Sequence, residues 1–585
     1  MPDSAISAFF RSSSADRPPL RIGILLDDVR LSRALASVVE DIQASNFARV
    51  ELLVFNAGEL SAPAQPARTP SLASRVFGIL TDAHRRRSLA WSLYTRLDRR
   101  HAQPMNDPLE SVDCSAMLDG IDRIHVHPVT KRFEHRFPET ALAHIRSARL
   151  DVLLRFGFNI LRGGILDAAR YGVWSFHHGD NDRYRGGPAH FWELAEDNPL
   201  SGVVLQRLTE DLDAGIILAK SLFATERGLS LARNRVRPYF GSTHLVIQKL
   251  RELHERGWDY VEEHCVPSAP YEGRRRIYKR PTNGELLRWA LPRVLGKAIA
   301  RSARSFTARE EVEHWRIAIR TGYRALEEGS HDMSGFRWIE SPRGHYYADP
   351  FLLERDGRIW IFFEDFLYSS GRGVISCAAI DSDGTMGPCQ VALETAGHLS
   401  YPYVFREGEA EYMIPESAAD GVVRLYRATA FPLGWKLHAE LYWGTAVDTS
   451  VCKHDGAWWF FTTLPEPRGQ GALLALFRAD SLTGRWVAHP LSPISADVRR
   501  ARGAGSIFRS GHSLIRPSQD GSRTYGYSFT LNRIVTLSPT EYDEQAIATV
   551  GPDWDPELLG THSYNRVGAI EVTDGKVRRR RRDVV

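Results

Sequence analysis

The sequence predicts two folds in one chain, an α/β doubly wound domain in the first half and an all-β five-bladed propeller in the second. Strand-like runs alternate with helix-length segments in the first half, which is typical of parallel βαβ units. Short aromatic and β-branched hairpins recur in the second half, which is typical of propeller blades. A length of 585 residues also exceeds what one hydrophobic core organises.

The first domain is predicted from the order of its strands. Strand-like runs at residues 21–26, 50–55, 123–129 and 151–157 are separated by helical patterns, and a helix at 242–257 closes the domain. A fifth run, GVWSF, ends just before His177. Ligands of such sheets bind beyond the carboxyl ends of the strands, so we expect the chemistry to lie in the loop after GVWSF, where His177 stands.

The propeller is predicted from repeated turn glycines. Gly357, Gly408, Gly456 and Gly511 each join two strand-like runs, and a weaker copy of the hairpin carries Gly575. Five copies predict five blades. The predicted boundaries are a flexible tail at 1–18, the α/β domain at 19–265, a basic helical linker at 266–335, the propeller at 336–578 and a basic tail at 579–585.

Composition excludes several classes of protein. The 43% hydrophobic and 25% charged residues are ordinary for a globular protein, and five scattered cysteines without CxxC spacing argue against a disulfide framework and a structural zinc site. A formal charge of +4 is too small to indicate a nucleic-acid partner. No signal peptide and no apolar run of about 20 residues is evident, which predicts a cytoplasmic protein.

Basic and apolar residues alternate in two segments, 84–100 and 274–304. Such segments can rest on an anionic membrane, so peripheral membrane contact through the basic linker is one interpretation. The other is a helix that packs on its own protein and turns a solvated basic face outward.

Four runs carry a resemblance in the first domain: SFH at 175–177, RYRGGPAHFWE at 183–193, SGVV at 201–204 and LDAG at 212–215. Together they resemble the folate-dependent formyltransferases, the family of methionyl-tRNA, glycinamide-ribotide and sugar-nucleotide N-formyltransferases, over residues 19–265. The resemblance implies N10-formyltetrahydrofolate as cofactor and an amine as acceptor. It also implies that His177 is the catalytic histidine and Asp213 its partner.

The chemistry of formyl transfer fits these residue types. A tetrahedral oxyanion needs hydrogen-bond donors, and the attacking amine must lose a proton. Ser175 stands where the family has asparagine, so His178 or Asn181 would supply the missing donor, while Tyr184, Arg185 and Gly186 form the substrate loop. The alternative is a catalytically retired domain. A metal site is not expected, because His177 and its neighbour point to opposite sides of a strand.

The propeller offers its own polar residues: Asp349 and Asp448 at equivalent places on inner strands, Glu364 and Glu416 on second strands, and Arg500 and Arg502 in the fourth blade. The runs ADPFLLERDGRIWIFFED, YPYVF with IPES, and AVDTS resemble five-bladed glycoside-hydrolase-like propellers and the N-terminal domain of glucosamine inositolphosphorylceramide transferases. Three roles remain open: the aspartates bind a phosphorylated or acidic sugar, form a hydrolytic pair, or cap turns.

The sequence therefore predicts two alternative functions. The first is transfer of a formyl group from N10-formyltetrahydrofolate to a small-molecule amine, expected to be an amino sugar or glycoconjugate precursor. The alternative is a propeller-based glycosidase, a glycosyltransferase-associated protein or a glycan-binding protein, with the first domain reduced to a scaffold.

Overall fold

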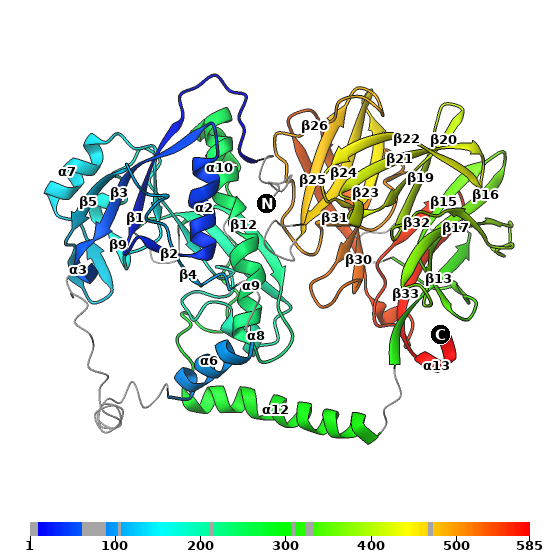
Figure 1. Cartoon of the computed structure of the whole chain (residues 1–585), viewed down its shortest axis with the longest axis horizontal. Helices are drawn as coiled ribbons and strands as arrows, with labels where there is room; N and C mark the ends of the chain where they lie inside the picture. Colours follow the sequence, from blue (N-terminus) through cyan, green and yellow to red (C-terminus); the bar gives the residue numbers. More distant parts are fainter. Residues whose placement is uncertain are drawn as a thin grey trace. The chain divides into compact units, whose positions relative to one another are not determined.

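The computed structural model describes residues 10–60, 89–102, 107–210, 215–267, 269–306, 311–322, 331–465 and 472–585. These residues form two compact units, one up to Ala300 and the other from Arg301 onward. Figure 1 shows the first unit as a sheet with helices on its faces and the second as a ring of antiparallel sheets.

The first unit is built on a seven-stranded sheet in the order β12-β11-β10-β8-β1-β3-β5. Its strands are β1 (Leu20–Leu26), β3 (Ala48–Asn56), β5 (Asp122–Val126), β8 (Val152–Arg155), β10 (Val173–His177), β11 (Leu200–Arg207) and β12 (Ile216–Ala224). The five strands from β5 to β10 are parallel, as predicted. In contrast, β11 and β12 run antiparallel, so the sheet is mixed at that edge.

Helices cover the sheet because their apolar residues recur on one face. In α2 (Arg33–Gln43) Ser32 caps the first turn, its Oγ accepting from the Leu35 amide at 3.3 Å, and Val38 and Ile42 are buried. The other long helices are α6 (Leu89–Ala102), α7 (Glu139–Ser147), α9 (Leu231–Gly241), α10 (His244–Arg256) and α12 (Asn283–Phe306). Among the described residues, no helix has the length and apolar character needed to cross a membrane.

Short elements complete the first unit. The helices are α3 (Ala57–Leu60), α8 (Phe191–Ala195) and α11 (Trp258–Glu263), and the strands are β2 (Arg30–Ser32), β4 (Ser111–Asp113), β6 (Val129–Lys131), β7 (Glu134–Arg136) and β9 (Ile160–Arg162).

The second unit is a propeller of five sheets. Blade 1 holds β15 (His345–Arg355), β16 (Arg358–Leu367), β17 (Arg372–Ile380) and β18 (Gln390–Leu393), and blade 2 holds β19 (Ser400–Glu407), β20 (Ala410–Glu416), β21 (Val422–Ala430) and β22 (Gly434–Trp443). Blade 3 holds β23 (Val447–His454), β24 (Ala457–Pro465), β25 (Ala472–Ala479) and β26 (Val487–Ala488). Blade 4 holds β27 (Arg502–Gly503), β28 (Phe508–Ser510), β29 (Ser513–Asp520), β30 (Ser528–Leu537) and β31 (Tyr542–Val550).

Blade 5 joins the two ends of the propeller sequence. It pairs β32 (Tyr564–Val567) and β33 (Ile570–Arg580) with β13 (Glu311–Thr321) and β14 (Arg337–Ile339). The predicted boundary at residue 336 is therefore wrong, because β13 lies inside the range expected to be a linker. The predicted basic tail is also structured: β33 reaches Arg580 and the short helix α13 (Arg581–Val584) follows.

Four of the five predicted turn glycines lie in hairpin turns. Gly357, Gly408, Gly456 and Gly511 have φ between 57° and 75°, a conformation that glycine adopts without strain. The fifth assignment was wrong, because the turn of the last hairpin is at Gly568. Gly575 lies within β33, where a Cβ would come within 2.5 Å of the Trp338 ring. The glycine there permits close packing.

Candidate functional sites

The first candidate site lies at the end of β10. Residues two apart on a strand share a side, and the polar atoms of both Ser175 and His177 are held by the chain itself. The Ser175 Oγ accepts from the Arg155 guanidinium at 3.1 Å, and the His177 Nε2 lies 2.9 Å from the Tyr184 carbonyl oxygen. Because a carbonyl only accepts, Nε2 carries the proton and Nδ1 is the basic atom of this ring. Asp213 lies outside the described residues, so its pairing with His177 stays a prediction.

A cavity of about 350 Å³ opens at the carboxyl ends of the parallel strands, with His178 in its wall. The His178 ring stacks on Tyr239 with centroids 3.9 Å apart, and its Nδ1 is buried without a hydrogen-bond partner. Burial lowers the pKa of His178 well below its ordinary value, so the ring is neutral. Phe156 and Phe176 supply apolar walls, and Asp28 lies at the edge.

The loop after β10 is held by ionic and aromatic contacts. The Lys220 ammonium binds Asp180 at 2.6 Å and Asp182 at 2.7 Å; burial opposes its charge, and the two carboxylates overcome this and raise its pKa. Arg185 lies over a tyrosine ring, 4.4 Å from the ring centroid of Tyr271.

Two other predicted loop residues are tightly enclosed. The Asn181 backbone oxygen accepts from the Arg185 guanidinium at 3.0 Å, whereas its buried side-chain oxygen has no hydrogen-bond partner. Gly186 has φ 92°, and a Cβ there would meet the Tyr278 carbonyl oxygen at 2.4 Å. The predicted loop residues therefore give the segment its shape.

Two buried groups behind this loop were not singled out from the sequence, although both stand in the RYRGGPAHFWE run. His190 and Glu193 lie 3.5 Å apart, and each is 1% exposed. Burial lowers the pKa of His190 to about 3 and raises the pKa of Glu193 to about 8. At neutral pH this pair is an uncharged ring beside a protonated acid.

The second candidate site is built on irregularities of the inner propeller strands. Asp349 in β15, Tyr401 in β19 and Asp448 in β23 have φ of 48°, 44° and 50°. The register of each strand with its neighbour shifts at the same place. A bulge redirects a side chain at the cost of backbone strain, and such strain concentrates at functional sites.

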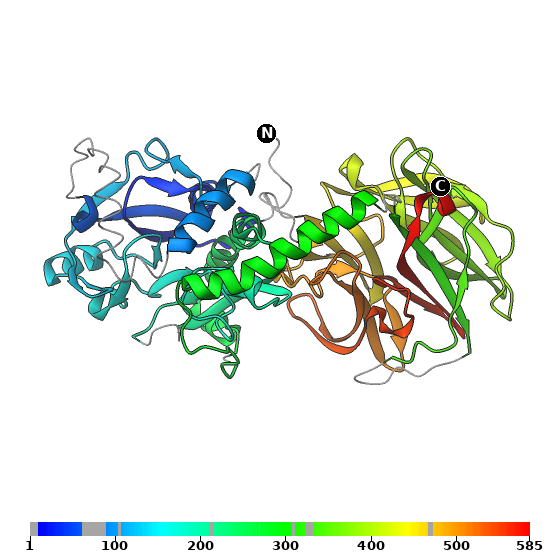
Figure 2. The same cartoon turned by 90° about the horizontal axis from the view of Figure 1, so that it is seen from below.

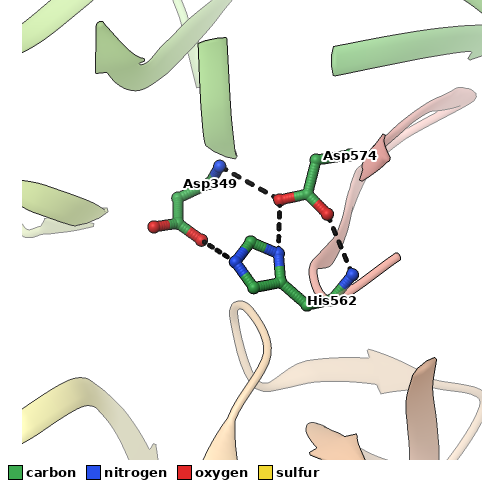
Figure 3. A group of neighbouring side chains, drawn as sticks. All are labelled: Asp349, His562 and Asp574. Atoms are coloured by element: carbon green, nitrogen blue, oxygen red, sulfur yellow. Dashed lines mark hydrogen bonds and ion pairs between the residues drawn. The ribbon is translucent and has the colours of Figure 1, made fainter. Parts of the chain in front are cut away.

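Asp349 belongs to a buried group with His562 and Asp574 (Figure 3). The His562 ring lies between the two carboxylates, 2.7 Å from Asp574 and 3.6 Å from Asp349. Desolvation opposes the imidazolium, but the carboxylates raise its pKa, while the pKa of Asp574 is lowered. Desolvation raises the pKa of Asp349 to about 7. The three ligand atoms lie within 4.8 Å of one another, so this group can also hold a cation.

Asp448 forms an ion pair with an arginine of the fourth blade. The Arg502 guanidinium contacts the Asp448 carboxylate and lies 3.8 Å from Glu416. Desolvation and the nearby Asp448 charge raise the pKa of Glu416 well above its ordinary value. Arg502 occupies the place predicted from the sequence. Arg500, predicted beside it, lies instead near Asp497, at 3.7 Å.

Glu364 completes a group that we call the central cluster. Its carboxylate lies 3.5 Å from the His398 ring, and burial with the neighbouring Asp349 charge raises its pKa well above the ordinary value. The central cluster comprises Asp349, Glu364, Glu416, Asp448, Arg502, His562 and Asp574. Five carboxyl groups thus face one guanidinium and one imidazole, which leaves an excess of acid. His562 and Asp574 are not among the residues predicted from the sequence. Asp574 stands in the run TDG at 573–575, which resembles a hairpin turn, and no motif marks His562.

The comparisons with known proteins find two kinds of relative. The propeller matches a known family model. Residues 340–555 match the model described as Glucosamine inositolphosphorylceramide transferase 1, N-terminal. The protein of that name from Oryza sativa subsp. japonica is 37% identical over 205 residues, which are 34% of this chain and 28% of the rice protein. The aligned region therefore spans less than a third of the relative's length.

The first unit has relatives of its own. Methionyl-tRNA formyltransferase from Agathobacter rectalis is 33% identical over 85 residues, 14% of this chain and 27% of that protein. A glycinamide ribonucleotide transformylase from Symbiobacterium toebii matches with 15% identity and a TM-score of 0.27, covering 46% of this chain and 98% of the other. The predicted resemblance of both halves, formyltransferase-like and transferase-propeller-like, is confirmed.

Proposed function

We propose that this protein is a transferase that acts on an amino-sugar glycoconjugate, and that the central cluster of the propeller binds the sugar through its ammonium group. The supporting observation is the excess of carboxyl groups in the cluster. Burial and neighbouring acids raise the pKa of Glu364 and of Glu416 well above the ordinary value, because they disfavour the charged form. An ammonium group bound beside these carboxyl groups would favour their charged form and pair with it.

The relatives support an amino sugar over other cations. The matched plant protein is named for glucosamine, and the propeller residues that carry the central cluster fall largely within the matched range. The hydroxyl groups of the sugar would accept hydrogen bonds from the Arg502 guanidinium. Tyr525, whose ring lies 4.9 Å from that guanidinium, is half exposed and offers an aromatic face.

Calorimetric titration of the full-length protein with glucosamine, N-acetylglucosamine and glucose tests this proposal. We expect glucosamine to bind at least about tenfold more tightly than the two neutral sugars, because only it carries an ammonium group. Glu416→Gln should remove that preference. Glu409→Gln is the matched control in the same blade, since its side chain is 97% exposed. Equal affinity for the three sugars, or a preference that survives Glu416→Gln, contradicts the proposal.

A second function, formyl transfer to an amine, is supported by the cavity beside His178. Its apolar walls and unpaired ring nitrogen fit a flat heterocycle such as that of N10-formyltetrahydrofolate, which would supply the formyl group. His177 is not among the residues that line this cavity, so its proposed role is toward the amine and not toward the cofactor. As the amine nitrogen attacks the formyl carbon and the bond from that carbon to N10 breaks, the His177 Nδ1 would take the proton of the amine, and N10 would be protonated as it leaves. Ser175, whose hydroxyl accepts from the Arg155 guanidinium, would assist His177 from the same side of the strand.

Titration with 5-formyltetrahydrofolate, a stable folate analogue, tests the second function. We expect micromolar binding by the wild type and a loss for Phe176→Asp, which places a charge in the cavity wall. His177→Ala should keep binding and lose turnover with an amine acceptor. No binding to a folded wild-type protein rejects folate use without affecting the sugar proposal.

A further inference from the structure

Helix α12, the long helix of Figure 2, carries two sets of apolar side chains, one buried and one exposed. Leu286 and Trp289 are 3% and 6% exposed and pack in a cluster with Trp91 and Phe191. The opposite face carries large apolar side chains at helical spacing. These are Leu287, Leu291, Val294, Leu295 and Ile299, which are 56%, 56%, 49%, 53% and 69% exposed.

Helix α6 repeats this arrangement next to α12. Its Trp91 is buried in the same cluster, and the Ala90 amide donates to the Asn283 side chain at the start of α12, at 2.9 Å. On its outer side, Leu89, Leu93 and Leu97 are spaced four residues apart and are 39%, 60% and 43% exposed. Two neighbouring helices therefore both expose large apolar side chains.

The charges beside these leucines are mostly positive, although Arg293 binds Asp197, at 2.5 Å. Up to Ile299, α12 carries Arg288, Arg293 and Lys297 against one acid, Glu285. That acid is already paired with Arg275, at 2.9 Å. In α6 the one acid, Asp98, accepts from the Ala232 amide at 2.8 Å, while Arg99 and Arg100 stand in the last turn.

We propose that the outer faces of α6 and α12 form a surface that binds an anionic lipid bilayer. Exposed leucines flanked by arginine and lysine insert apolar atoms at the headgroup boundary while the cations remain among anionic headgroups. Self-association fits the charges less well, because a twofold interface would place the same basic surface against itself. The proposal is independent of the sugar and formyl sites.

Flotation of the full-length protein with vesicles tests the proposal. We expect it to float with vesicles of phosphatidylcholine and phosphatidylserine, and to bind pure phosphatidylcholine at least about tenfold more weakly. The triple variant Leu287→Gln, Leu291→Gln, Ile299→Gln removes apolar atoms and keeps a good helix former at each position. It should reduce binding to anionic vesicles at least about tenfold. Added salt should weaken the remaining binding of the triple variant to anionic vesicles, because salt screens the attraction between its cations and the headgroups.

The matched control removes three exposed apolar side chains elsewhere. Val391, Leu437 and Val535 in the propeller are 52%, 53% and 56% exposed, and their triple substitution by Gln should leave flotation unchanged. Failure of the wild type to float with anionic vesicles overturns the proposal. So does equal loss in both triple variants. A wild-type dimer in sedimentation that the α12 variant dissociates, without lipid binding, would assign the face to self-association instead.

Discussion

Among single residues, Arg502 decides whether the central cluster is stable, because it is the guanidinium that faces Asp448 and Glu416. Asp448 is 3% exposed, so removing the guanidinium leaves a buried carboxylate with the Gln519 amide as a donor, at 3.2 Å, but without a cation. We expect Arg502→Gln to lower the free energy of unfolding by about 3 kcal/mol. Chemical denaturation of the full-length protein measures it.

The control for Arg502 is an arginine in an exposed ion pair of the same unit. Arg406 lies 3.1 Å from Glu409, whose side chain is 97% exposed. Exposed pairs contribute little, so Arg406→Gln should change stability by less than about 1 kcal/mol. Equal effects of the two substitutions would show that Arg502 makes no special contribution.

The buried pair behind the β10 loop gives the first unit a pH dependence. The folded pKa of Glu193, about 8, lies above its unfolded value, so the native state binds the extra proton and stability falls as pH rises toward 8. The lowered pKa of His190 acts oppositely, and its contribution is lost as pH falls below the ordinary histidine value. Above that value only the Glu193 effect remains.

We therefore expect Glu193→Gln, which cannot ionise, to unfold less readily than the wild type at pH 8 and to show a smaller decline of stability above about pH 6.5. The decline that Asp349 causes, with its pKa raised to about 7, is the same in both proteins. Thermal unfolding of the two proteins across this range measures the difference. A difference in melting temperature that does not change with pH would mean that Glu193 is ionised in the folded protein.

The candidate residues show what sequence reasoning can find. Asp349 and Asp448 were predicted because each precedes a strand run in a recognisable repeat, and the structure places both at strained positions of inner strands. His562 and Asp574 were missed, since they meet Asp349 only when the last blade closes on the first. Residues that come together only when the propeller ring closes are not marked by any local sequence pattern.

At the scale of the elements, the periodicity of apolar residues predicted where the strands lie in the sequence better than it predicted whether they run parallel or antiparallel. Alternation and apolar runs located β1, β3, β8 and β10, because buried strands need them. The antiparallel direction of β11 was not predicted, since the short apolar run SGVV fits either direction. Strand direction depends on the connection that precedes the strand.

The hairpin turns yield a prediction of their own. Gly456 has φ 75° and no atom within 4 Å of a built Cβ, so an added methyl group meets backbone strain alone. We expect Gly456→Ala to lower stability by about 1–2 kcal/mol. Gly551, at φ −90° with its nearest neighbour at 3.6 Å, is the control, and Gly551→Ala should be tolerated. If both substitutions cost the same, the turn conformation is not responsible.

At the scale of the whole molecule, the change of sequence character predicted two units, and the structure has two. What composition could not predict is how the ring closes. Arg320 of β13 binds Glu571 of β33 at 2.6 Å, although the two residues are 251 positions apart. Both side chains are almost fully buried, so this pair joins the start and end of the propeller inside its core.

This closure predicts where a self-folding propeller must begin. A chain of residues 311–585 keeps β13, whereas one that begins at residue 336 leaves β33 without its partner over the eleven residues of β13 and Glu571 without Arg320. An unpaired strand edge and an unpaired buried carboxylate both oppose folding. We expect the longer chain to unfold in one cooperative transition and the shorter one to aggregate or lack a transition. Circular dichroism during heating distinguishes them, and cooperative unfolding of both chains would show that β13 is not needed for closure.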